Sequence, residues 1–119
     1  MDIFTAVKQN DSNAILDFIR VNQDLNIKDK NGMTPLMHAA DNDSITIVSL
    51  LLNQKIKVDE FDKYGQTALM LASGRGNRRI VQLLLSAKAN VNLVSESGAT
   101  AFDFAIENRH RDIAALLRK

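Results

Sequence analysis

Polar and apolar residues follow one another along this chain in a pattern that returns at a fixed spacing. The stretch "KNGMTPLMHAA" at 30–40 returns as "KYGQTALMLAS" at 63–73 and again as "ESGATAFDFAI" at 96–106. Each copy holds one glycine and one threonine at the same two places: Gly32, Gly65 and Gly98, then Thr34, Thr67 and Thr100. Self-similarity at a constant period indicates an array of repeated structural units.

Residues 29–61 illustrate what one unit is expected to form. The polar stretch 29–32 ends in glycine, which is the chemistry of a tight turn with a positive φ. Thr34 offers an oxygen to the free N–H groups at a helix start, and Pro35 follows where a missing N–H costs little. We therefore predict a turn followed by a short helix over the segment "PLMHAA".

A second apolar run at 45–54 has helical spacing, with Ser44 as its expected N-cap. Both helices are shorter than the roughly 12 to 15 residues that an isolated helix needs in water, so stacking of neighbouring units must stabilise them. The periodic apolar positions predict the stacked core: Leu36, Leu69 and Phe102; Ala39, Ala72 and Ala105; Ile47, Ile80 and Ile113; Leu51, Leu84 and Leu117.

These residues carry a family resemblance. "GMTPLMHAA" followed by "IVSLLLNQKIKVDEFDK", and "GQTALMLAS" followed by "IVQLLLSAKANVNLVSE", resemble ankyrin repeats, whose pattern begins G-x-T-P-L-H-x-A-A. The resemblance covers the whole chain and implies an all-α ankyrin-repeat solenoid of four helix–turn–helix units joined by β-turn loops. It also implies one domain over 1–119, with repeats at about 1–28, 29–61, 62–94 and 95–119.

The chain departs from the family pattern at the histidine of T-P-L-H, which is replaced by Met37, Met70 and Asp103. The hydrogen bond by which that histidine links adjacent turns therefore has no evident carrier. Asp17 and Arg118 replace leucines of the inner repeats, as expected of terminal repeats with polar outer faces. We expect a complete small protein or an independently folding domain that is monomeric when alone.

Composition limits the class of protein and the cellular location that we predict. The 119 residues are 45% apolar and 24% charged, which is ordinary for a globular domain and argues against general disorder. The chain has no cysteine, no apolar run of membrane-spanning length and no secretory signal at its start. From these features we predict a cytoplasmic location and no membrane partner.

Catalytic chemistry has little support in the sequence. His38 and His110 are the only histidines, and no third ligand stands at a recognisable metal spacing from either. We expect His38 to pack in the core. The stretch "SGRGN" at 73–77 lacks the preceding strand and the G-K-[ST] ending of a phosphate-binding loop, so its glycines are expected to turn the chain between helices. We predict no enzyme, no metal, no cofactor and no small-molecule substrate.

Charge is unevenly distributed. Residues 1–60 carry 6 basic and 9 acidic side chains (net −3), and residues 61–119 carry 9 and 5 (net +4). A linear stack would turn this difference into an acidic and a basic half, which could steer an acidic protein or a phosphate. The alternative is a solvated charged face without a partner. Aromatic residues are not interleaved with the arginines, so single-stranded nucleic acid is disfavoured.

The ankyrin resemblance implies that protein partners bind to the concave face, which is formed by the turn tips and the exposed side of the short helices. Phe61 and Tyr64 fall on a turn that we expect to be exposed to solvent. Large aromatic groups displayed on a rigid surface favour a binding hot spot. The alternative is that Phe61 folds back over a neighbouring turn. When the positions of the family's concave face are transferred to this sequence, the predicted partner-binding residues are Lys28, Lys30, Asn31, Met33, Asp41, Asn42, Phe61, Lys63, Tyr64, Gln66, Arg75, Val94, Glu96, Ser97, Glu107 and Asn108.

The function predicted from the sequence is therefore protein recognition, centred on Met33, Phe61, Tyr64 and Arg75. Binding would block or mask the partner, as in small ankyrin proteins that resemble kinase inhibitors or toxin-neutralising immunity proteins. A structural adaptor that bridges two partners is the alternative, and a nucleic-acid-associated factor is less favoured.

Overall fold

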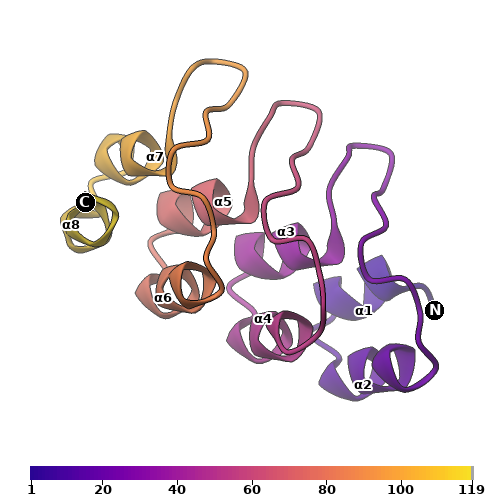
Figure 1. Cartoon of the computed structure of the whole chain (residues 1–119). Helices are drawn as coiled ribbons and strands as arrows, with labels where there is room; N and C mark the ends of the chain where they lie inside the picture. The colour runs from indigo at the N-terminus through magenta and orange to yellow at the C-terminus, as the bar shows by residue number, and fades with distance from the viewer. Residues whose placement is uncertain (119) are drawn as a thin grey trace.

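The computed structural model describes residues 1–118, which form paired helices. Figure 1 shows α1, α3, α5 and α7 in one row and α2, α4, α6 and α8 in a second row beneath it. The long loops before α3, α5 and α7 project above the first row (Figure 1). The helices span Ile3–Lys8 (α1), Ser12–Arg20 (α2), Pro35–Asp41 (α3), Ile45–Leu52 (α4), Ala68–Arg75 (α5), Arg78–Ser86 (α6), Ala101–Glu107 (α7) and Arg111–Leu117 (α8).

The short helices begin where the repeated threonines predict. The Oγ1 atom of Thr34 accepts a hydrogen bond from the backbone N–H of Met37 at 3.2 Å, and Thr67 and Thr100 cap α5 and α7 in the same way. The Met37 Sδ atom in turn accepts from the Thr34 N–H at 3.4 Å. Ser44 is the N-cap residue of α4, as predicted, although its side chain makes no capping hydrogen bond.

Backbone hydrogen bonds join the tips of adjacent loops, which we call fingers and define as residues 29–33, 62–66 and 95–99. The N–H of Lys63 donates to the carbonyl of Asn31 at 3.0 Å, and that of Glu96 donates to Tyr64 at 2.9 Å. Inside the second of these fingers, the Asp62 carboxylate accepts from two backbone N–H groups at 2.9 Å. Adjacent turns are therefore linked without the missing histidine.

The core lies between the two rows and follows the predicted positions. The periodic alanines and isoleucines are fully buried, and the periodic leucines of α4 and α6 are too. Phe102 is the exception, because its ring stays partly exposed and the Arg118 guanidinium lies 5.6 Å from the ring centroid. At the other end, Asp17 forms an exposed ion pair with Arg20 at 2.7 Å. Within residues 1–118, no helix is long and apolar enough to cross a membrane.

Candidate functional site

A groove runs between the fingers and the exposed side of the short helices, and Phe104 of α7 is at its centre. Phe104 lines two adjoining hollows, of about 270 Å³ and about 210 Å³. The first is lined by Tyr64, Gln66, Ser95, Glu96, Ser97 and Phe104. The second is lined by Asp41, Met70, Leu71, Gly74, Arg75, Phe104 and Asn108. We call the two together the Phe104 groove.

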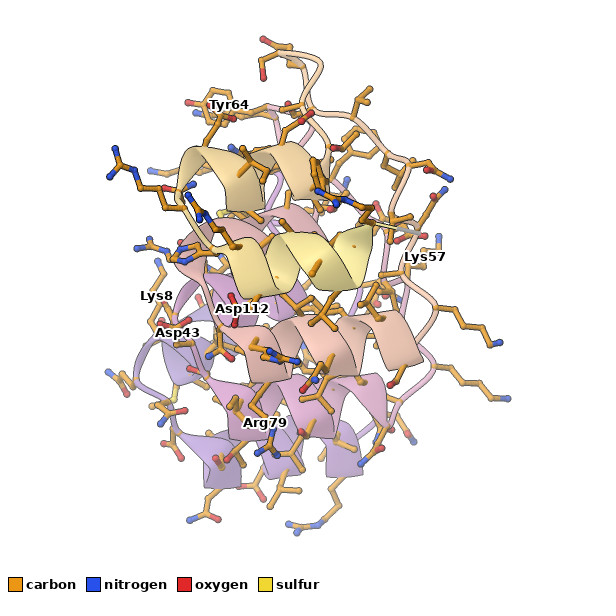
Figure 2. All side chains as sticks on the ribbon, turned by 90° about the vertical axis from the view of Figure 1, so that its left-hand side faces the viewer. Lys8, Asp43, Lys57, Tyr64, Arg79 and Asp112 are labelled. Atoms are coloured by element: carbon orange, nitrogen blue, oxygen red, sulfur yellow. The ribbon has the colours of Figure 1, made fainter. Side chains whose placement is uncertain are left out.

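Figure 2 shows where Tyr64, which lines the first hollow, lies on the molecule. Tyr64 lies above α7 on the same side as Lys8 and Asp43, whereas Lys57 points away on the opposite side (Figure 2). Tyr64 is 54% exposed, so its ring is available to a partner, and Lys63 Nζ lies 5.2 Å from the ring centroid.

Sequence reasoning missed Phe104. Phe104 lies at the position equivalent to His38, which we expected to pack in the core, yet the structure leaves the Phe104 ring only partly buried. The available signal was its size, because an aromatic ring at a position that tolerates threonine in the first repeat, at Thr5, is larger than the core requires.

An ion pair between repeats fixes one wall of the groove. Arg75 Nε of α5 donates to Asp41 Oδ1 of α3 at 2.9 Å. This hydrogen bond, with the nearby charges of Asp41 and Asp43, raises the pKa of Arg75 above its ordinary value. Arg75 therefore stays cationic across the accessible pH range, in an orientation that Asp41 restricts.

Phe61 lines a different hollow, of about 330 Å³, with Leu93, Val94 and Thr67. Ser95 and Glu96 line both this hollow and the first hollow of the Phe104 groove. An antiparallel bridge pairs Phe61 with Thr67, the two residues that flank the finger 62–66. Because side chains alternate along extended backbone, Phe61 lies on the opposite side from Gln66. The ring is 57% exposed and lies under Lys28 Nζ, 4.7 Å from its centroid. The structure thus separates Phe61 from Tyr64, which sequence spacing had placed in one cluster.

The other residues expected on the binding face are distributed unevenly. Met33 is partly buried against the core and lines neither hollow of the groove. Asn31 uses its carbonyl to hold the next finger, and Glu107 lines a separate hollow beside Ser97. Exposed side chains at the remaining positions belong to Lys28, Lys30, Asn42, Lys63, Val94, Glu96 and Asn108.

The two histidines have structural partners. His38 is buried, with Nε2 2.7 Å from Asp29 Oδ2, as expected of a packing role. His110 Nε2 lies 3.2 Å from the carbonyl of Gly74. Gly74 lies inside α5, so the prediction that it turns the chain is wrong, whereas Gly76 makes the turn with φ 82°. Within residues 1–118, no three side chains form a cluster able to hold a metal ion.

Asp29 gives the fold an acid-sensitive contact. Burial alone would raise the pKa of its carboxyl group, but hydrogen bonds from His38 and from the backbone N–H groups of Met33 and Asn31 outweigh burial and hold the pKa below its ordinary value. A carboxyl group with a lowered pKa stabilises the folded state above its unfolded-state pKa. That stabilisation is lost as the pH falls through the folded-state pKa.

We therefore expect Asp29→Asn to lower the free energy of unfolding by about 1 to 2 kcal/mol at pH 7. The variant should also lose less stability than the native chain between about pH 4 and pH 2. Urea unfolding at both ends of that range measures the effect. Asp62→Asn is the matched control, because Asp62 makes the same two backbone contacts, while the residue equivalent to His38 in its repeat is Leu71. An equal loss in the free energy of unfolding for the two variants would contradict a contribution from the His38 contact.

Stacked helix pairs with projecting, hydrogen-bonded fingers define the class of helical repeat solenoids. A family model described as "Ankyrin repeats (3 copies)" matches residues 3–95 and 62–119. These matches span most of the sequence, so the chain belongs to the ankyrin repeat family. Ankyrin repeats are generally protein–protein interaction modules and are typically non-catalytic. No curated protein matches this sequence.

Proposed function

We propose that this chain is a non-catalytic module that binds a protein partner in the Phe104 groove and thereby blocks or masks the surface it covers. The observation that carries this proposal is the pair of adjoining hollows around Phe104, which combine aromatic, amide and charged groups on one face. Aromatic groups at the centre of a polar-rimmed surface are typical of binding hot spots.

Preorganisation supports this mechanism. The fingers are held to one another by backbone hydrogen bonds, and Arg75 is held by Asp41, so little conformational entropy is lost when a partner binds. A standard interface of about 1,600 Å² in total would cover the groove and the finger tips. The absence of cysteine fits action in a reducing compartment such as the cytoplasm.

Affinity capture from the source cells tests the proposal when two matched variants are compared. Tyr64→Glu places a charge inside the groove, and Phe61→Glu places the same charge on an equally exposed aromatic outside it. We expect one protein to be retained by the native chain and by Phe61→Glu and lost with Tyr64→Glu. Circular dichroism should show native helix content for both variants. Retention of the same protein by Tyr64→Glu would place the binding surface elsewhere.

Blocking is tested separately, by adding the native chain to the captured partner. We expect the partner to lose its own activity or binding at the concentration of native chain that saturates the interaction. If the partner stays active in the complex, the blocking role is rejected and only the binding of the partner is supported.

A structural adaptor is the second candidate, and the hollow at Phe61, which adjoins the Phe104 groove at Ser95 and Glu96, favours it. Phe61 and Val94 are both more than half exposed and line one apolar depression outside the Phe104 groove. Under this alternative, Phe61→Glu loses a second protein that Tyr64→Glu retains.

A further inference from the structure

The smaller hollow of the Phe104 groove exists because one side chain is absent. Asp41, Gly74 and Glu107 occupy equivalent places in successive short helices. Asp41 reaches across to Arg75 of the next helix, whereas Gly74 has nothing to extend toward Asn108, the residue equivalent to Arg75. Asn108 instead donates from Nδ2 to the carbonyl of Phe104 in its own helix at 2.8 Å. The space between remains open, with a volume of about 210 Å³.

The backbone does not require glycine at position 74. Gly32, Gly65, Gly76 and Gly98 have positive φ angles, but Gly74 has not and lies within α5. A Cβ atom at Gly74 would lie 3.5 Å from Asn108 Nδ2 and 3.5 Å from Phe104 Cδ2, which is ordinary contact. Glycine inside a helix costs about 0.5 to 1 kcal/mol relative to alanine. Glycine at position 74 therefore lowers the stability of α5 slightly and leaves the hollow open.

The lining of the hollow indicates what would occupy it. Phe104, Leu71 and Met70 supply an apolar floor. Asp41 is the only carboxylate of the described residues that line it, and that carboxylate is already paired with Arg75. Arg75 uses only Nε in this pair, so the other N–H groups of its guanidinium have no hydrogen-bond acceptor within residues 1–118. Apolar area and an available cation therefore lie side by side.

We propose that this hollow is an anchor site for an apolar side chain of the size of leucine, presented by an acidic segment of a protein partner whose carboxylate binds Arg75. The net charge of +4 in residues 61–119 favours the approach of such a segment. The inference rests on the proposed function, since it describes the partner of the same groove.

Capped tripeptides test the site without knowledge of the partner. The full chain, labelled with ¹⁵N, is titrated at low ionic strength with acetyl-Glu-Leu-Glu-amide while its backbone amide resonances are followed. We expect saturable shifts concentrated at Gly74, Arg75 and Asn108. Acetyl-Glu-Ala-Glu-amide should bind about tenfold more weakly, because it buries less apolar surface. Acetyl-Lys-Leu-Lys-amide should also bind more weakly, because it opposes Arg75.

Gly74→Leu closes the hollow from within and should abolish the shifts. This variant should stay folded, since leucine is a better helix former than glycine by about 0.8 kcal/mol. Ala115→Leu is the matched control, because it adds the same side chain at an exposed position of α8 and should bind like the native chain. Arg75→Gln should remove the preference for the acidic peptide over the basic one.

Three results would overturn the proposal: shifts that persist in Gly74→Leu, equal binding of the leucine and alanine peptides, or equal binding of the acidic and basic peptides. Failure here is distinguishable from failure of the proposed function. A captured partner that is lost with Tyr64→Glu but retained by Gly74→Leu would preserve the groove as a binding surface and reject this anchor site.

Discussion

Replacing Ile80 with alanine should lower the free energy of unfolding by about 3 to 4 kcal/mol. Ile80 is fully buried in α6, which packs against both α4 and α8. The substitution removes apolar contacts and leaves a cavity at the middle of the stack, where three helix pairs meet. Because small domains have a total stability of about 5 to 15 kcal/mol, this loss is a large fraction of the whole.

Urea unfolding followed by circular dichroism measures this change. Ile106→Ala is the matched control, because it removes the same atoms from a side chain that is 46% exposed in α7. We expect the control to cost less than about 1 kcal/mol. Similar losses at the two positions would mean that the central stack does not dominate stability.

The helices and most of the core could be predicted because burial in a repeat array is periodic. Ala72 and Ile80 recur at equivalent places in the neighbouring repeats, and the structure buries both completely. Phe102 shows the limit of this reasoning, since the same pattern placed it in the core and the structure leaves it partly exposed. Periodicity reports which face a residue occupies, and the burial of that face depends on what packs against it.

The candidate site was harder to predict because it depends on side-chain direction in a finger and in the residues that flank it. Phe61 and Tyr64 are three residues apart, which suggested one cluster, but the pairing of Phe61 with Thr67 turns its side chain away from the groove. The hollow at Gly74 depends on a side chain that is missing, together with the direction taken by Asn108. A list of residue types contains neither kind of information.

The fingers themselves provide the second large effect that we expect. Gly65→Ala should lower the free energy of unfolding by about 2 to 4 kcal/mol, for two separate reasons. The φ angle of Gly65 is +73°, a conformation that disfavours any side chain. In addition, a Cβ atom there would lie 2.9 Å from the backbone nitrogen of Glu96, which cannot yield as a flexible side chain would.

Gly98→Ala separates the two causes. Gly98 has a similar φ angle of +86°, but a Cβ atom at this position would have no neighbour within 4 Å. This variant should therefore lose only the conformational part, about 1 to 2 kcal/mol. The difference between the two losses, measured by urea unfolding, isolates the contact between fingers. Equal losses would show that adjacent fingers separate readily.

The Gly65 contact also bears on function, because the nitrogen that the new Cβ would displace donates to the carbonyl of Tyr64 at 2.9 Å. If that hydrogen bond holds the two fingers in register, hydrogen exchange at the Glu96 amide should be faster in Gly65→Ala than in Gly98→Ala. Glu96 and Tyr64 line the same hollow, so the loss would reach the groove directly. A rigid finger array is then what presents Tyr64 and Phe104 to a partner in one fixed geometry.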